Sequence, residues 1–259
     1  MKFDMHCHTK EGSLDGKVPV ADYISKLMGL GYDGMLITDH NSYNGYRSWK
    51  RTIKDNCFKD FIVLKGIEYD TIDAGHMLII MPETVKLAIL EMRGLPVQFL
   101  IDIVHKNGGI LGPAHPCGEK YQSILNTRKF REQPAIMERF DFIEAFNACE
   151  NTLSNAKASL FANQFDKQFF GGSDAHKMEC VGLGYTIIED PVYSESELIS
   201  YVKAGESVSC GGSYYKGTTK EKMGRANQLL VESFWVYNRL GSMVRHHRRV
   251  AELSKYKIG

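Results

Sequence analysis

The stretch that decides the fold of this chain is its first one, Lys2-Phe3-Asp4-Met5-His6-Cys7-His8-Thr9. It begins as a short apolar run and ends in His6 and His8, which are two residues apart. Residues two apart on a strand point to the same face, so the two imidazoles can bind one metal ion. A chance His-Cys-His pattern would explain the pair equally well if it stood alone.

Short apolar runs of this kind recur along the chain, each beside polar residues. They comprise residues 34–37 before Thr38-Asp39-His40, 61–64 before Gly66-Ile67-Glu68, 77–80 after His76, 109–111 before Ala114-His115-Pro116, 142–143 before Glu144, and 169–172 before Ser173-Asp174-Ala175-His176. Their length and continuous apolarity are typical of buried parallel strands. Helical patterns occur at residues 20–30, 97–104 and 195–203, the last after Ser194 as a candidate N-cap. The alternation predicts an α/β fold with a parallel sheet or barrel, and barrel enzymes keep their active sites at the carboxyl ends of the strands.

Imidazoles and carboxylates collect at these strand ends. Asp174 and His176 repeat the two-residue spacing of the first pair, and further donors stand at other strand ends: His40, Glu68, His76 and His115. Imidazole nitrogen mixed with carboxylate oxygen suits Zn, Mn or Fe, and the lack of thiolate ligands argues against a closed structural zinc site. The set exceeds what one ion needs, so we expect two or three divalent metal ions. Paired ions about 3.5–4 Å apart stabilise the attacking and leaving oxygens of an in-line displacement.

These motifs, in this order, resemble the polymerase and histidinol phosphatase (PHP) family of phosphoesterases. The resemblance covers about residues 2–184 and consists of His6-Cys7-His8-Thr9, Ser13-Leu14-Asp15-Gly16, Thr38-Asp39-His40, Gly66-Ile67-Glu68, His76, Ala114-His115-Pro116 and Ser173-Asp174-Ala175-His176. It implies a distorted seven-stranded (β/α) barrel of the TIM-like, PHP type, with three metals at the carboxyl ends of the strands.

The resemblance also implies a role for each matching residue. One ion would be held by His6, His8, Glu68 and Asp174; Glu68 would bridge to a second ion bound by His76 and His115; a third would be held by Asp15, His40 and His176. The catalytic set would be His6, His8, Glu68, Asp174 and His176. Asp15 lies in Leu14-Asp15-Gly16, which is also a good turn sequence, and some family members carry His at that position. The number of residues between the glutamate that matches Glu68 and the next histidine varies among related proteins, so the match of His76 to a family ligand is less specific than the others.

Several other polar residues are open to two interpretations. A phosphate needs positive side chains, and the candidate substrate contacts are Arg47, Lys120, Arg128 and Lys177, although Lys and Arg on loops are usually solvated. Asp39 and Glu144 would either orient a ligand imidazole or serve as buried structural carboxylates. We expect His105 to stabilise a helix C-terminus, and His246 and His247 to lie on the surface.

Composition and length define the class of protein. A chain of 259 residues fits one barrel domain of about 250 residues. The net charge of +1 argues against a strongly basic nucleic-acid binder, but from residue 216 onward ten Lys or Arg face three Asp or Glu, which leaves −6 for residues 1–215. We expect a PHP-like barrel over residues 1–215 and a basic helical tail over residues 216–259 packed on it, either with a solvated face or in contact with an anionic partner.

The same features predict where the protein works. Six scattered cysteines with no CxxC pair indicate reduced thiols, and no apolar run approaches the roughly 20 residues that cross a bilayer. We therefore expect a cytoplasmic protein without a membrane partner. The phosphate-loop, dinucleotide-binding and G-x-S-x-G motifs are absent from the sequence.

The expected activity is hydrolysis of a small-molecule phosphate ester, such as a nucleotide, a sugar phosphate or a compound like histidinol phosphate, by a metal-bound hydroxide. Three alternatives remain: a 3′–5′ exonuclease or phosphodiesterase acting on nucleic acid, a catalytically silent metal-binding regulatory domain, and a hydrolase of C–N bonds. The acidic balance of residues 1–215 makes nucleic acid an unlikely partner.

Overall fold

A computed structural model describes residues 1–53, 58–118, 122–216, 233 and 236 of the chain. The predicted tail over residues 216–259 lies outside the described residues, apart from positions 216, 233 and 236. Among the helices that are described, none has the length and apolarity needed to span a membrane.

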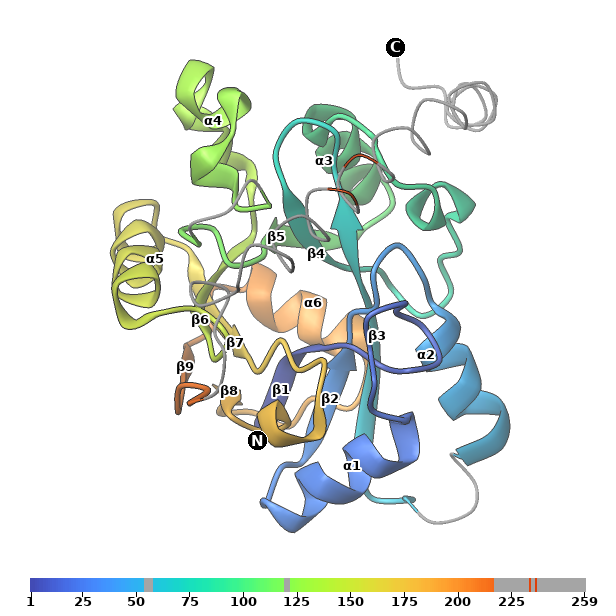
Figure 1. The fold of residues 1–259 in the computed structure, drawn as a ribbon. Helices are drawn as coiled ribbons and strands as arrows, with labels where there is room; N and C mark the ends of the chain where they lie inside the picture. The colour runs from blue at the N-terminus through green and yellow to red at the C-terminus, as the bar shows by residue number, and fades with distance from the viewer. Residues whose placement is uncertain (54–57, 119–121, 217–232, 234–235, 237–259) are drawn as a thin grey trace.

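A curled seven-stranded sheet forms the centre of the molecule (Figure 1). Its strands run in the order β5 (Ile110–Pro113), β4 (His76–Ile80), β3 (Ile62–Asp70), β2 (Gly34–Ile37), β1 (Lys2–Cys7), β8 (Gly184–Ile188) and β9 (Val208–Gly212). Strands β1, β2 and β3 are parallel, whereas β4, β5, β8 and β9 each pair in antiparallel fashion with a neighbour.

The prediction of a parallel sheet is therefore wrong for part of the chain. Strand β4 returns directly alongside β3, with Asp70 opposite His76. Only residues 71–75 separate the two strands. A parallel crossover needs a dozen or more residues, so this short link permits only an antiparallel hairpin.

A ribbon of two parallel strands, β6 (Phe142–Asn147) and β7 (Gln168–Gly172), lies between the two sides of the curled sheet. On one side the amide of Asp141 donates to the carbonyl of Leu111 on β5, at 2.9 Å. On the other side the amide of Asp174 donates to the carbonyl of His6 at 2.9 Å, and Cys7 forms a parallel bridge with Ala175. The ribbon thus brings the ends of β7 and β1 together. The α/β class is confirmed, and the barrel that the resemblance implies is found in part, as this curled mixed sheet.

The predicted helices are present with small shifts at their ends. They are α1 (Val20–Gly29), α3 (Val97–Lys106) and α6 (Glu195–Lys203). Ser194 caps α6 as expected, because its hydroxyl accepts from the amide of Glu197 at 3.2 Å. The sequence pattern did not reveal α5 (Thr152–Gln164), which exposes Leu153 and Leu160 and so lacks a clear apolar stripe. Shorter helices are α2 (Asn44–Ser48), which continues as a π-helical turn over Trp49–Ile53, and α4 (Arg128–Glu132); 3₁₀ turns span Ala88–Glu91, Ile124–Asn126, Pro134–Arg139 and Met178–Cys180.

The core has an inner part, enclosed by the strands and by α6. Inward side chains from nine strands form it together with helix residues such as Leu198 and Val202; the strand members include Phe3, Met5, Leu36, Leu64, Leu78, Ile80, Ile110, Phe142, Phe170, Ile188 and Val208. In the view of Figure 1, α6 is seen in the middle of the molecule, with strands on several sides of it. The rings of Phe142 and Phe170 stack with their centroids 4.1 Å apart, so the ribbon is anchored in this inner core.

The outer face of the sheet is also buried, beneath helices. Met35 and Ile37 pack with α1, whereas Leu36 between them points into the inner core. Met77 and Ile79 likewise pack with α3. Because both faces are covered, the strands are apolar at successive positions, which explains the continuous runs in the sequence.

We predict that Phe142→Ala lowers the free energy of unfolding by about 3–5 kcal/mol, since it removes a fully buried ring from the inner core. Urea denaturation would measure this loss. Phe99→Ala is the matched control, because Phe99 on α3 is 42% exposed and should cost much less. Equal losses in the two variants would contradict the assignment of Phe142 to the core.

Candidate metal centre

The nine residues predicted as ligands lie together at one end of the sheet. His6 lies on β1 and His8 just beyond it, Glu68 is on β3 and His76 begins β4. The others follow strand ends or occupy a loop: Asp15, His40, His115, Asp174 and His176. The hydrogen bond between the backbones of Asp174 and His6 brings Asp174 and His176 close to His6 and His8.

Four of these residues form what we call the first group: His6, His8, Glu68 and Asp174. His8 Nε2 is 3.1 Å from His6 Nε2, 3.2 Å from Glu68 Oε2 and 3.3 Å from Asp174 Oδ1. His6 Nε2 is 3.5 Å from Glu68 Oε2. Atoms that each lie about 2.0–2.2 Å from one metal ion stand about 3–3.5 Å from one another, as these atoms do. The four side chains are almost completely buried.

Glu68 also belongs to a second group with His76 and His115. Its Oε1 is 2.8 Å from His76 Nδ1 and 3.1 Å from His115 Nε2. The two oxygens of one carboxylate therefore face two different sets of donors.

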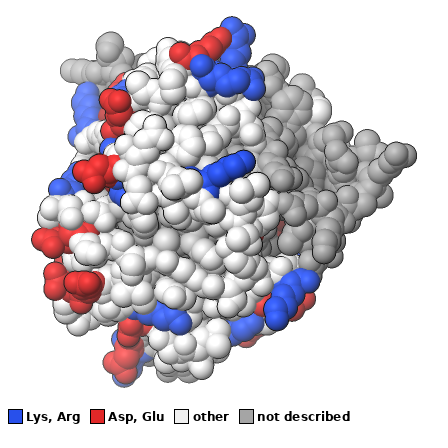
Figure 2. Space-filling view, turned by 90° about the vertical axis from the view of Figure 1, so that its left-hand side faces the viewer, with Lys and Arg blue, Asp and Glu red and all other residues white. Residues whose placement is uncertain are grey.

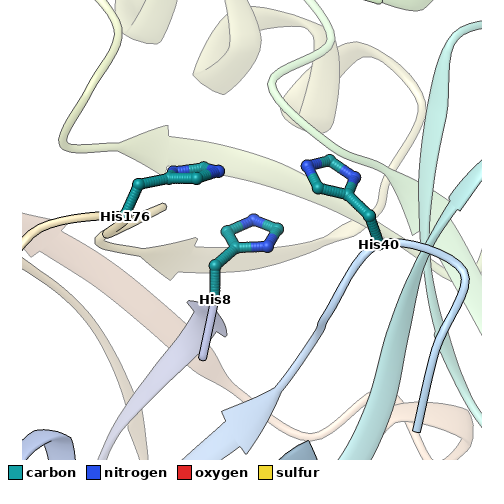
Figure 3. A group of neighbouring side chains, drawn as sticks. All are labelled: His8, His40 and His176. Carbon is teal, nitrogen blue, oxygen red and sulfur yellow. The ribbon is translucent and has the colours of Figure 1, made fainter. Parts of the chain in front are cut away.

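The third group consists of Asp15, His40 and His176 and is more open. Asp15 Oδ2 is 3.2 Å from His176 Nε2 and 3.6 Å from His40 Nε2. Figure 3 shows His40 and His176 on either side of His8, a member of the first group, and one ring nitrogen of each of the three lies within 4.8 Å of the others. The side chain of Asp15 is 45% exposed and that of His176 28%, so this side of the centre faces solvent.

Hydrogen bonds on the opposite ring nitrogen orient several of the imidazoles. His6 Nδ1 donates to Glu144 Oε1 at 2.8 Å, and His176 Nδ1 donates to the carbonyl of Asp174 at 3.0 Å. Glu144 also accepts from the amide of His115. Of the two interpretations of Glu144, the structure thus favours the carboxylate that orients an imidazole. Such bonds fix the tautomer that presents Nε2 to an ion.

His8 is oriented through Ser13. The Ser13 hydroxyl donates to Asp39 Oδ1 at 3.0 Å, so its oxygen is left to accept from His8 Nδ1 at 3.1 Å. Asp39 accepts further bonds from Thr9 and contacts no ligand imidazole directly within hydrogen-bond distance. It is therefore linked to His8 by hydrogen bonds through Ser13. Of the two interpretations of Asp39, the structure favours the carboxylate that helps to orient an imidazole, and the part of Ser13 is the one that the sequence did not reveal.

The charges in the centre perturb one another strongly. Burial alone would lower the pKa of His40, but Glu68, Asp70 and Asp15 raise it to about 10. Burial also opposes the charge on His6, whose pKa is nevertheless raised well above its usual value by Glu144, Asp174 and Glu68. Burial would raise the pKa of Glu68, but the neighbouring imidazoles hold it well below its usual range.

The donor set fits divalent cations. Within the described residues, Glu68 Oε2, His40 Nδ1 and Asp70 Oδ1 are buried polar atoms with no hydrogen-bond partner, although each has another donor atom within 3.1–3.4 Å. Buried polar atoms normally have partners.

Asp70 is a residue that the sequence analysis did not identify. The signal that could have found it is the two-residue spacing in Glu68-Tyr69-Asp70, which equals the spacing of His6 with His8 and of Asp174 with His176.

Backbone strain is concentrated at the centre. His115 and Asp174 have positive φ angles of 30° and 50°, and Asn41, directly after His40, has 48°. Such conformations are uncommon outside glycine and cluster at functional sites. At Gly172 an added Cβ would stand 2.5 Å from the backbone nitrogen of His6, so glycine is required for β7 to approach β1.

Two of the four candidate phosphate contacts are paired with carboxylates outside the three groups. Arg47 is held by Glu91, with bonds of 2.7 Å and 3.0 Å, and Arg128 is exposed and paired with Glu132. Lys177 is exposed beside His176, and Lys120 lies outside the described residues.

The remaining histidines are away from the centre or not described. His105 lies in the last turn of α3, as predicted, with its Nε2 2.9 Å from Asp141 Oδ2. His246 and His247 lie outside the described residues.

Comparison with known families gives two matches. The family model of the PHP domain matches residues 4–161, and that of the PHP-associated domain matches residues 152–207. No curated protein matches the chain.

Solved structures share the fold at low sequence identity. A candidate metal-dependent phosphoesterase from Bifidobacterium adolescentis is 14% identical, with a TM-score of 0.59, over 79% of this chain and 96% of the other. Endonuclease Q, in complex with a 27-mer duplex that carries an abasic lesion, is 14% identical, with a TM-score of 0.51, over 78% and 56%. An amidohydrolase from Chromobacterium violaceum is 13% identical, with a TM-score of 0.56, over 78% and 96%.

We predict that divalent metal affinity rises with pH between about 6 and 8. Without ions, the raised pKa values of His6 and His40 keep these imidazoles protonated, and a metal ion binds only the neutral form. Each proton released on binding should make the affinity about tenfold stronger per pH unit. Chelator competition at several pH values would measure the slope, and an affinity that does not change with pH would contradict the prediction.

Proposed function

The chain belongs to the PHP family, and from this premise we propose that it is a metal-dependent phosphoesterase, a hydrolase that cleaves phosphoric ester bonds.

The position of the Glu68 carboxylate is the observation that carries this proposal. Its Oε1 lies with the second group, 2.8 Å from His76 Nδ1, while its Oε2 lies with the first, 3.2 Å from His8 Nε2. A carboxylate shared in this way would contribute one oxygen to each of two neighbouring cations. Paired cations suit an in-line displacement at phosphorus, because they stabilise both the attacking and the leaving oxygen.

Each group of residues has its own role in this proposal. The first and second groups would hold two divalent ions and the third group would hold a further one, with Zn, Mn or Fe suited to the mixture of imidazole and carboxylate. When bound, such ions lower the pKa of water and neutralise charge on the phosphoryl oxygens. Glu144 and Ser13 hold the imidazoles of His6 and His8 in the required orientation.

The substrate approaches from the third group. The first group is buried, whereas Asp15 and His176 are partly exposed. An ester that enters on this side meets Asp15 and His176. Of these two, the imidazole of His176 is our candidate for direct contact with the reacting atoms, besides His6, His8, Glu68 and Asp174.

Arg93 is an additional candidate for contact with the phosphate. Its Nη1 is buried without a hydrogen-bond partner in the described part of the chain. Its backbone crosses the carboxyl end of β3: the carbonyl of Met92 accepts from the Tyr69 hydroxyl, and the amide of Gly94 donates to the Asp70 carbonyl at 2.7 Å. A guanidinium is well suited to phosphate, because it can form two parallel hydrogen bonds with it.

A small phosphorylated molecule is the substrate class that we favour. Residues 1–215 carry a formal charge of −6, and on the face shown in Figure 2 basic and acidic side chains alternate rather than gathering into one positive tract. A nucleic-acid substrate needs a basic groove. The likeness to Endonuclease Q keeps a nuclease as an alternative, and the likeness to the amidohydrolase keeps C–N bond cleavage as another.

The domain organisation remains part of this proposal. We propose that residues 1–215 form one barrel-like unit in which the ribbon completes the curled sheet.

We predict that His8→Ala and Asp174→Ala each abolish hydrolysis and remove bound metal without unfolding the chain, because each deletes a ligand of the first group. The measurements are elemental analysis, circular dichroism, and turnover of a panel of phosphorylated metabolites, an amide and a DNA duplex with an abasic site. His105→Ala, distant from the three groups, should retain activity. Full turnover by His8→Ala would refute the assignment, and cleavage of only the amide or the duplex would shift it to an alternative.

We predict that Arg93→Ala raises KM for the phosphate ester by at least about tenfold, the size expected when one charge-assisted contact of 1.5–3 kcal/mol is lost. The metal content should not change. Arg128→Ala is the comparison variant, since Arg128 is exposed and paired with Glu132. A larger effect at Arg128 than at Arg93 would reverse this choice.

A further inference from the structure

We infer a further cation position at Asp70, formed by Asp70 Oδ1, His40 Nδ1 and His76 Nε2. None of the three groups contains Asp70. The inference rests on the proposed function only in so far as the centre binds divalent ions, and it concerns how many positions the centre offers and which of them can be filled together.

The distances around Asp70 are those of donors around an ion. Asp70 Oδ1 is 3.3 Å from His76 Nε2 and 3.4 Å from His40 Nδ1. All three atoms lie within 4.8 Å of one another. A charge-assisted hydrogen bond between an imidazole and a carboxylate would be shorter, about 2.7–2.9 Å. Donor atoms about 2.0–2.2 Å from a shared metal ion have to stand farther apart, as these do.

The second observation is the lack of hydrogen-bond partners at this place. His40 Nδ1 and Asp70 Oδ1 are buried and form no hydrogen bond within the described residues. The same is true of Glu68 Oε2, whose side chain is only 1% exposed and which lies 3.1 Å from His40 Nδ1. Glu68 Oε2 also faces His8 of the first group, so the unpartnered atoms that belong to the new position are His40 Nδ1 and Asp70 Oδ1. A cation between these two atoms would supply the partner that each lacks. Two imidazole nitrogens and carboxylate oxygen suit Zn, Mn or Fe.

The scaffold holds Asp70 rigidly in this position. Asp70 ends β3 directly opposite His76 in the antiparallel register. Its amide donates to the side-chain oxygen of Asn41 at 3.0 Å, and its carbonyl accepts from the amide of Gly94. Asn41 itself follows His40 in a strained conformation with φ 48°. The carboxylate is thus fixed between the two imidazoles by both of its backbone polar groups.

The new position competes with the other groups for the same two rings. His40 points Nε2 at Asp15 of the third group and Nδ1 at Asp70; His76 points Nδ1 at Glu68 of the second group and Nε2 at Asp70. A neutral imidazole has a lone pair on only one nitrogen. Each ring therefore serves either its original group or the Asp70 position, and a filled Asp70 position leaves the second and third groups each short of one ligand. The centre can then exchange an ion between inner and outer positions by a change of tautomer.

Anomalous scattering from crystals of the full chain grown with Zn²⁺ or Mn²⁺ tests this inference. We expect a metal peak within about 2.0–2.3 Å of Asp70 Oδ1 in the natural protein. Asp70→Asn should lose this peak, keep the peak between His6 and His8, and bind less metal at saturation by elemental analysis. Asp102→Asn, which changes an aspartate paired with Arg139 outside the centre, should behave like the natural protein.

The possible outcomes separate this inference from the proposed function. If the natural protein shows ions in the three groups but none at Asp70, and Asp70→Asn binds as much metal, the inference is wrong and Asp70 serves only as a charged partner of His40 and His76. If no ion binds anywhere in the centre, both the inference and the metal-dependent mechanism are overturned.

Discussion

The structure of this centre depends on one buried carboxylate. Glu68 is almost inaccessible to solvent, and five imidazoles have a ring nitrogen within 3.5 Å of its oxygens: those of His6, His8, His40, His76 and His115. A buried charge is costly unless it is paired. In the metal-free protein the imidazoles supply that pairing by binding protons, as the raised pKa values of His6 and His40 indicate. Divalent ions can take over the same task, so metal binding and proton release are linked in this centre.

The apolar core fixes the distances that this arrangement needs. Strands of the curled sheet contribute inward side chains to one core, and the ribbon is anchored in it through Phe142 and Phe170. That packing brings Asp174 to His6 and Glu144 to the same imidazole, although these residues lie far apart in the sequence. The strained conformations at His115 and Asp174 persist because the packed elements on both sides leave the backbone no alternative.

The centre has a buried part and a part that is open to solvent. Glu68 and its closest donors lie inside, whereas Asp15 and His176 lie where a substrate can reach them. The proposed position at Asp70 lies between these two regions, beside rings that each face two sets of donors. An arrangement of this kind gives the centre more sites than it can fill at once, and the tautomers of His40 and His76 determine which are filled.

The sequence by itself determined the local features of this protein. Period-two spacing placed His6 with His8, continuous apolar runs marked strands buried on both faces, and the family motifs pointed to the right fold class. Asp174 and His176 have the same spacing, but they lie beyond β7, where Asp174 has a positive φ angle. The structure alone decided the antiparallel return of β4, the contacts of the ribbon, and the places of Glu144, Ser13 and Asp70 around the imidazoles. The reason is physical: spacing along a strand reports which face a side chain occupies, but the distance between side chains on different strands depends on register, strand direction and packing, which the whole chain sets together.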